Sequence, residues 1–174
     1  MAIWWTTTDG PQLAQGDLLP DCLLPVFLGI PADSTPNATI EQAVKRARLI
    51  VVTQSCDLEN EKVQFVALCP IHTLDEFEVG NPDFKKRGKW ETVRKGRLEG
   101  LHMLAGTDNP GDNRMSLVVD FSHIVSLPLA YLTQHASSLG SRSRLESPFL
   151  EHFSQAFARF FMRVGLPSAI PEFR

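Results

Sequence analysis

The sequence contains little cysteine and no long apolar run. Its 174 residues include three Cys, at positions 22, 56 and 69, which cannot all pair with one another and show no Cys-x-x-Cys spacing. A disulfide-based scaffold is therefore not expected, and a reducing cytoplasm suits such a chain. No window approaches the roughly 20 apolar residues of a membrane-spanning helix, and residues 1–8 lack the basic start and apolar core of a signal peptide. We expect a cytoplasmic protein without membrane contact.

A strong net charge is also lacking. The 17 Lys and Arg against 20 Asp and Glu give −3, which excludes a wholly basic nucleic-acid coat. Apolar residues (43%) and charged residues (21%) are near the globular average, which argues against long disorder or a fibrous repeat. A single domain of this length buries about 70% of the surface that its unfolded chain exposes, so it needs no metal or disulfide to fold. We expect one domain over residues 1–174, without a cofactor.

Hydrophobic patterning predicts strands early and helices late, which indicates an α+β class. The expected strands cover residues 16–19, 22–27, 49–54, 63–69, 101–104 and 115–120. The expected helices cover about 40–46, 83–95, 128–139 and 147–164, with a helical turn or two after residue 72. The last of these gathers its phenylalanines on one stripe, so it must pack on the sheet of its own chain or on a partner.

Polar groups follow two strands that we expect to be neighbours. Cys56 and Asp57 come after residues 49–54, and Cys69 and His72 end the strand over 63–69. If these ends meet, they offer a zinc site or a Cys-His nucleophile, although only Cys69-x-x-His72 has a zinc-like spacing. The structural alternative is that Asp57 caps a turn and Cys56 is a small core residue. We expect three other histidines to be structural rather than catalytic: His102, His123 and His152.

A basic stretch follows an acidic one. Residues 55–83 carry seven acids and one Lys, whereas residues 85–97 carry seven Lys and Arg against Glu91. With an aromatic residue among its cations, the second stretch has the composition of a surface for single-stranded nucleic acid: Lys85, Lys86, Arg87, Lys89, Trp90, Arg94, Lys95 and Arg97. The alternative is a solvated helix face, or a surface that pairs with the preceding acids.

Short motifs in a fixed order resemble the PemK/MazF type of toxin. Gly16-Asp17 opens the first strand, and Arg48 precedes a buried strand. Cys69–Thr73 ends the next strand in a Pro-Ile-Thr-like corner, and Val119–Ile124 leads from a late strand to a helix. The resemblance covers residues 12–135. It implies a small, strongly bent antiparallel β-barrel of the Src-homology-3-like kind, with inserted helices and a C-terminal helix.

The resemblance also implies an activity, since members of this family cut single-stranded RNA without a metal. Such cleavage needs a base, a cation for the phosphate and an acid for the leaving oxygen. The family's Arg falls on Arg48 and its Thr on Thr73 or His72. If the chain cleaves RNA, we expect Arg48 to stabilise the phosphate, His72 or Asp57 to carry the proton and Thr73 to position the substrate. We therefore expect an RNA- or single-stranded-DNA-binding protein that acts as a metal-independent endoribonuclease, with an antitoxin-like neighbour or a second copy as partner.

Two alternatives stay open at this point. In the first, the chain is a non-catalytic interaction module, and the Phe-rich helix docks on a partner or a second copy. In the second, it is a Cys-dependent enzyme centred on Cys56.

Overall fold

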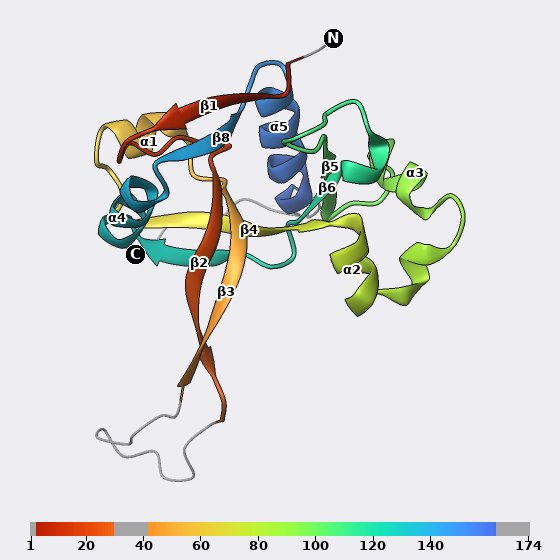
Figure 1. The fold of residues 1–174 in the computed structure, drawn as a ribbon, viewed down its shortest axis with the longest axis horizontal. Helices are drawn as coiled ribbons and strands as arrows, with labels where there is room; N and C mark the ends of the chain where they lie inside the picture. The colour runs from red at the N-terminus through yellow and green to blue at the C-terminus, as the bar shows by residue number, and fades with distance from the viewer. Residues whose placement is uncertain (1–2, 30–41, 163–174) are drawn as a thin grey trace, which may run out of the picture.

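The computed structural model describes residues 3–29 and 42–162. Its strands are β1 (Trp5–Asp9), β2 (Leu18–Phe27), β3 (Gln42–Val51), β4 (Phe65–Thr73), β5 (Leu101–Leu104), β6 (Leu117–Asp120), β7 (Val125–Pro128) and β8 (Ser141–Leu145). Its helices are α1 (Ser55–Glu59), α2 (Leu74–Gly80), α3 (Lys89–Arg94), α4 (Leu129–Leu139) and α5 (Phe149–Phe161), with short 3-10 turns η1 (Pro82–Lys85) and η2 (Asn113–Met115). Figure 1 shows this arrangement.

Antiparallel sheets form the frame, with β4 at the centre. The larger sheet has the order β2-β3-β4-β6-β5, and β7 also pairs with β4. β4 pairs with a different strand in each part of its length. Phe65–Leu68 pairs with β7, Leu68–Pro70 with β3 and Ile71–Thr73 with β6. β1 and β8 form a separate two-stranded sheet across the top of the molecule in Figure 1. The C-terminal part of β4 therefore lies where β3 and β6 meet.

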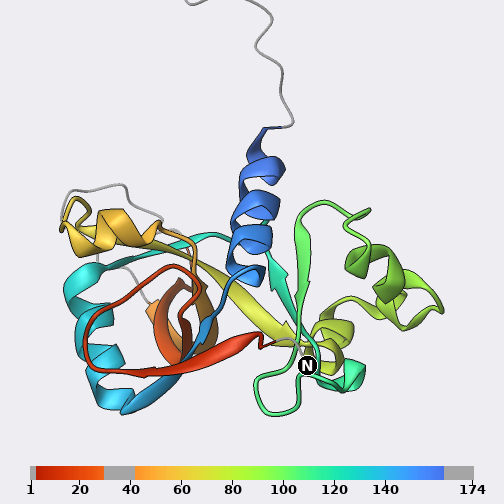
Figure 2. The same cartoon turned by 90° about the horizontal axis from the view of Figure 1, so that it is seen from above.

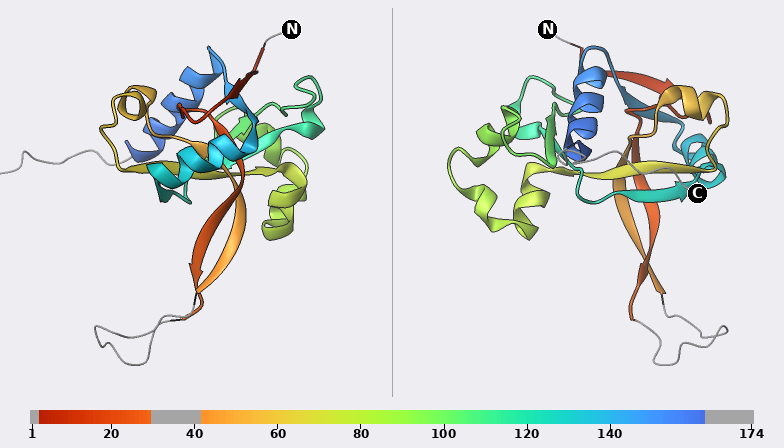
Figure 3. Two further views of the ribbon diagram at one scale, coloured as in Figure 1. Left: turned by 60° about the vertical axis from the view of Figure 1, so that its left-hand side comes forward. Right: turned by 180° about the vertical axis from the view of Figure 1, so that it is seen from behind.

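The predicted β-barrel is wrong. Within residues 3–29 and 42–162, β2 and β5 stand at opposite ends of the larger sheet, so no barrel closes. The barrel does not close because only Leu49–Val51 of β3 pairs with β4. The rest of β3 leaves the body with β2 as a twisted two-stranded ribbon (Figures 1 and 3). The structure is α+β with antiparallel sheets, which is the class that the patterning indicated.

Two predicted helices also need correction. The helix expected over residues 40–46 is wrong from residue 42 onward, because Gln42–Val51 is a strand in register with β2. Residues 40 and 41 lie outside the described residues. The helix expected over 83–95 is divided into η1 and α3, because Gly88 between them adopts φ +87°, a left-handed conformation that interrupts a helix. Cross-strand pairing has overridden the local helix signal in the first case.

Buried apolar side chains fill both sides of the central strands. Leu19 and Leu49 pack with Leu132 of α4 in one cluster, whereas Ile50 and Ile71 pack with the α5 helix in another. Phe153 of α5 is fully buried, and the helix contributes further partly buried aromatics to the same cluster: Phe149, Phe157 and Phe160. Figure 2 shows α5 standing on the sheet. Most of the Phe stripe thus packs within its own chain.

A buried ion pair joins the beginning of β2 to β8. The side chains of Asp17 and Arg142 are both fully buried, with Arg142 Nε 2.9 Å from Asp17 Oδ2. Arg144 Nη2 donates to the same carboxylate oxygen over 2.9 Å. Gly16, in the motif that opens the first predicted strand, adopts φ +84° and leaves room for Leu145 and Leu150, which lie 2.9 and 3.0 Å from where its Cβ would be. The Gly16-Asp17 motif therefore has a structural role here.

Candidate functional site

A cavity of about 610 Å³ lies where the ribbon joins the body. We call it the histidine cavity, because His72 from β4 and His123 from the turn between β6 and β7 both line it. The other side chains at its rim include the cations of β3 (Lys45, Arg46 and Arg48), the acids Asp21 and Glu76, and the apolar residues Leu24, Ile71 and Val125. The structure thus brings Arg48 and His72 together, as the sequence predicted, through the antiparallel pairing of β3 and β4.

Arg48 is held by an ion pair with α2. Its Nη2 atom lies 3.5 Å from Glu76 Oε1, and the two side chains are 33% and 51% exposed. Glu76 is itself fixed by a capping box, in which Thr73 N–H donates to Glu76 Oε2 over 2.7 Å and Glu76 N–H donates to Thr73 Oγ1 over 3.2 Å. The hydrogen bond from the Thr73 backbone is the main cause that lowers the pKa of Glu76. Glu76 is therefore an ionised, positioned partner of Arg48 at neutral pH.

His72 is half-buried on β4. Burial is the main cause that lowers its pKa below the ordinary 6.5, and the positive charges of Arg48 and Lys45 act in the same direction. Glu76 and Asp120 partly oppose this effect. At neutral pH the imidazole is therefore uncharged, with one ring nitrogen able to accept a proton.

His123 belongs to a carboxylate–imidazole pair that the sequence analysis missed. Its Nδ1 atom lies 2.8 Å from Asp120 Oδ2. Asp120 is held in turn, because its Oδ1 accepts hydrogen bonds from the Ser122 N–H over 2.9 Å and from the Ser122 hydroxyl over 2.5 Å. The His123 side chain is 74% exposed, whereas that of Asp120 is 12% exposed. The Asp-x-x-His spacing after a predicted strand was the signal that could have found this pair.

A second cavity, of about 490 Å³, lies next to the first. We call it the hydroxyl cavity, because Thr73, Thr107, Ser141 and Ser143 line it. Pro20 and Arg48 line both cavities, so Arg48 stands at their common border. Thr73 is therefore near Arg48, but its hydroxyl accepts the N–H of Glu76 and so fixes the first turn of α2.

Asp57 and Cys56 lie elsewhere. Both belong to α1, which adjoins the beginning of β4, since Val52 N–H donates to Ala67 O over 3.0 Å just before that helix. The five residue steps of strand from Ala67 to His72 span about 16 Å. Asp57 lies 3.8 Å from Lys62 Nζ, and Cys56 is an exposed thiol. The structure does not bring these two residues to Arg48 and His72.

The remaining cysteines are buried. Burial raises the pKa of the Cys22 and Cys69 thiols to about 12. In the described part of the chain, no three His, Cys, Asp or Glu side chains are grouped so that they could hold a metal ion.

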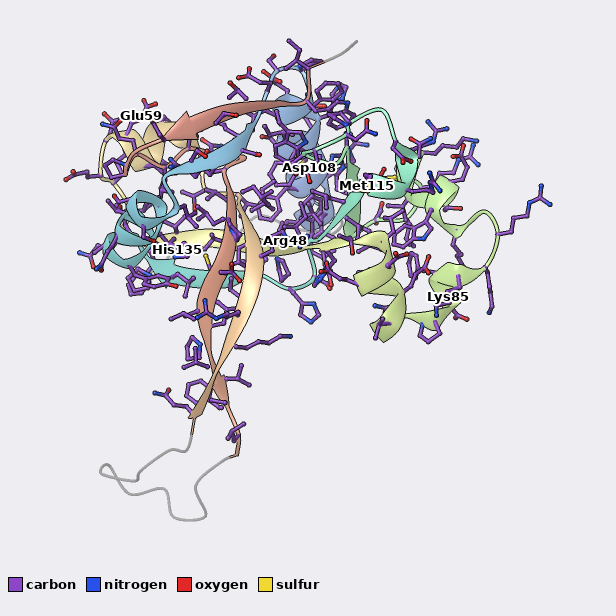
Figure 4. All side chains as sticks on the ribbon, in the orientation of Figure 1. Arg48, Glu59, Lys85, Asp108, Met115 and His135 are labelled. Atoms are coloured by element: carbon purple, nitrogen blue, oxygen red, sulfur yellow. The ribbon has the colours of Figure 1, made fainter. Side chains whose placement is uncertain are left out.

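The basic stretch surrounds a small aromatic cluster, apart from both cavities. Trp90 packs against Phe77 and Phe84, with ring centroids at 5.8 and 4.9 Å, and its indole N–H donates to Glu78 Oε1 over 2.8 Å. Several of the predicted cations form ion pairs with neighbouring acids: Lys86 with Asp83, and Arg94 and Lys95 with Glu91. The others form no ion pair with a described residue: Lys85, Arg87, Lys89 and Arg97. Figure 4 shows Lys85 well separated from Arg48.

Comparisons with known proteins add no family to this description. No family model matches the chain, and neither a curated protein nor a solved structure matches it. The resemblance to the PemK/MazF toxins therefore stays a prediction. Of the helices that the structure describes, none has the length and apolar character that crossing a bilayer demands.

Proposed function

We propose that the histidine cavity binds a phosphodiester of single-stranded RNA and cleaves it without a metal ion. The observation that supports this most directly is that Arg48, His72 and His123 line one cavity. These residues supply the groups that transesterification of RNA requires, namely a cation for the phosphate and two groups that exchange protons. The apolar residues of the same cavity offer a surface for a nucleotide base.

The reaction gives each of these three side chains one role. Neutral His72 accepts the proton of the ribose 2′-hydroxyl while the 2′-oxygen forms a bond to phosphorus. The bond from phosphorus to the 5′-oxygen breaks, and the doubly protonated form of His123, with its Nδ1–H on Asp120, donates its Nε2 proton to that leaving oxygen. Arg48 stabilises the charge that builds up on the non-bridging phosphate oxygens. The products are a 2′,3′-cyclic phosphate and a free 5′-hydroxyl.

Asp120 acts in this scheme as a positioning residue. Its hydrogen bond to Nδ1 fixes the orientation of the His123 ring and leaves Nε2 as the atom that meets the substrate. When His123 carries both protons, the carboxylate pairs with its charge. The turn formed by Asp120 and Ser122 keeps the carboxylate itself in place.

The basic stretch extends the proposed binding surface. Four of its cations have no ion-pair partner among the described residues and line neither cavity: Lys85, Arg87, Lys89 and Arg97. They would therefore bind a distal part of a long RNA strand. Contacts of this kind contribute non-specific affinity that falls steeply with salt. The stretch is thus proposed to increase affinity without changing the chemical step.

The test is an assay of RNA cleavage in the presence of EDTA, with analysis of the new ends. We expect 2′,3′-cyclic phosphate and 5′-hydroxyl ends, and a loss of at least about 100-fold in rate for His123→Ala and for Arg48→Ala. His152→Ala is the matched control, because His152 is exposed on α5 and lines neither cavity. Absence of cleavage by the wild-type protein over a range of RNA sequences would overturn the proposal, as would full activity of His123→Ala.

A further inference from the structure

The hydroxyl cavity has the position of a subsite next to the proposed scissile phosphate. Arg48 borders both cavities, so a phosphate bound to its guanidinium has the histidine cavity on one side and the hydroxyl cavity on the other. At about 490 Å³ the hydroxyl cavity has the volume of a small-molecule pocket. A strand that places one phosphate at Arg48 therefore places a neighbouring nucleotide in this second cavity.

The charges of the hydroxyl cavity favour a base over a second phosphate. Asp75 and Asp108 both line it and both are exposed, so their carboxylates repel a phosphate group that enters. Three cations line it as well, and each has a partner. Arg142 Nε donates to the buried carboxylate of Asp17, Arg114 Nε lies 3.4 Å from Asp112 Oδ1, and Arg48 at the border is the residue proposed to hold the scissile phosphate. Carboxylate oxygens accept hydrogen bonds from the exocyclic amino groups of bases, as they do for the N4 amine of cytosine.

The walls of the cavity also suit a planar base. Met115 is 46% exposed and lines the cavity, and a thioether forms favourable contacts with aromatic rings. Thr107 lies beside Asp108, and its hydroxyl donates to Asp108 Oδ1 over 3.3 Å, which orients the carboxylate. Figure 4 shows Asp108 and Met115 on the same side of the molecule, above Arg48. The loop after β5 thus presents an acceptor next to an apolar surface.

We infer that the hydroxyl cavity binds the base of the nucleotide next to the scissile phosphate, and that Asp108 selects bases that carry an exocyclic amino group. This inference rests on the proposed function, because that function places the phosphate at Arg48. Adenine and cytosine present an amine to Asp108, whereas uracil presents a carbonyl oxygen, which the carboxylate repels. The cleaved RNA is accordingly one with an amino-bearing base beside the cut.

Binding of uncleavable strands tests the inference separately from catalysis. The probes are fluorescent 2′-O-methyl oligonucleotides of adenine, cytosine or uracil, which lack the attacking hydroxyl, and the readout is Kd by anisotropy at one fixed salt concentration. We expect the wild-type protein to bind the adenine and cytosine strands about tenfold more tightly than the uracil strand. Asp108→Asn should reduce this ratio to about threefold or less, because an amide can also donate to the uracil carbonyl.

The test depends on the ratio of Kd values between the oligonucleotides and not on any single Kd. Loss of any carboxylate raises the affinity for a polyanion, whatever its bases. Glu59→Gln is the matched control, because it removes the same charge from α1, apart from Asp108 in Figure 4, and should leave the ratio unchanged. Equal affinity of the wild-type protein for all three strands, or an unchanged ratio in Asp108→Asn, overturns the subsite. Selective binding that depends on Asp108, in a protein that cuts no RNA, would instead overturn the proposed cleavage and leave the subsite standing.

Discussion

Arg48 Nη2 lies 3.5 Å from Glu76 Oε1, so the cation at the border of both cavities already has an anionic partner. The partner is rigid, because the capping box with Thr73 holds Glu76 at the beginning of α2. A phosphate that approaches Arg48 must therefore compete with a carboxylate that remains ionised. Both side chains are partly exposed, so the pair is weak and can open.

Glu76→Gln should strengthen binding of RNA. The substitution removes the negative charge that competes for Arg48, while a glutamine can still accept the Thr73 N–H in a capping box. We expect Kd for a single-stranded RNA to fall about threefold to tenfold at low salt, with a change in Tm of no more than a few degrees. The measurement is anisotropy at several salt concentrations. Glu59→Gln controls for net charge, and an equal gain in affinity for that variant would contradict the competition at Arg48.

Asp120→Asn should lower kcat with little effect on KM. An asparagine amide directed at Nδ1 donates a hydrogen bond instead of accepting one, which favours the wrong tautomer of His123. We expect kcat to fall about 100-fold, while the Ser122 bonds to the side-chain oxygen keep the turn folded. Because both residues act through one ring, the double variant with His123→Ala should be no slower than His123→Ala alone. Additive losses would show that Asp120 acts elsewhere.

The sequence predicted correctly that β3 and β4 are neighbours, but it did not predict how the sheets are arranged in the molecule. Leu49–Val51 is apolar on both faces, so its central position could be inferred, and with it the meeting of Arg48 and His72 across β3 and β4. The ribbon could not be inferred, because residues 42–48 have no pattern that distinguishes a strand within a barrel from one that leaves it. β1 and β8 were missed because their sequences, WTTTD and SRSRL, are mostly polar and show little hydrophobic alternation.

Only part of the candidate site was predictable, namely the residues that the pairing of β3 with β4 brings together. Arg48 and His72 are brought together by local pairing between two strands that follow closely in sequence. His123 reaches the cavity through β6 and β7, which pair with β4 across a gap of about 50 residues, and no local pattern encodes that distance. Asp57 was expected at the site because its strand end was placed beside that of His72. The antiparallel order of β3 and β4 puts these two ends at opposite ends of β4.

Asp17→Asn should destabilise the fold strongly. The change removes the charge that neutralises Arg142, whose side chain is fully buried beside Asp17. Loss of one partner of a buried pair costs about 3–5 kcal/mol in free energy of unfolding. The measurement is urea-induced unfolding at pH 7. Asp112→Asn serves as control, since the facing Arg114 side chain is 91% exposed and a solvent-exposed ion pair adds little to stability. Similar losses in both variants would contradict this role of Asp17.

His102 should make the stability depend on pH between about 4 and 6.5. Burial against Phe121 and Phe153, and then the charges of His152 and Arg159, lower its pKa to about 4. The unfolded chain, with the ordinary pKa of 6.5, therefore binds a proton more readily than the folded one in this interval. The stability that neutral His102 contributes is complete above pH 6.5 and is lost as the pH falls towards 4, by up to about 3 kcal/mol.

His102→Phe checks this assignment, because a phenyl ring keeps the aromatic contacts and does not titrate. Unfolding by urea at pH 7 and pH 4.5 should show a loss of stability for the wild-type protein that exceeds the loss for the variant by about 2–3 kcal/mol. Carboxylates titrate equally in both proteins, so the difference reports His102. The same pH dependence in the two proteins would show that the ring is solvated at low pH.

Gly106→Ala should destabilise the floor of the hydroxyl cavity. A Cβ at Gly106 would lie 2.3 Å from the backbone oxygen of Met115, so the chain must shift around η2. We expect a loss of about 1–3 kcal/mol in free energy of unfolding. Gly80→Ala is the matched control, because a Cβ there meets no atom within 4 Å and alanine reduces the entropy of the unfolded chain, which stabilises by about 0.4–1 kcal/mol. A loss of stability in Gly106→Ala together with a gain in Gly80→Ala would support this packing. An unchanged free energy of unfolding in Gly106→Ala would show that the loop after β5 adapts freely. In that case Asp108 and Met115 could not form a fixed binding surface.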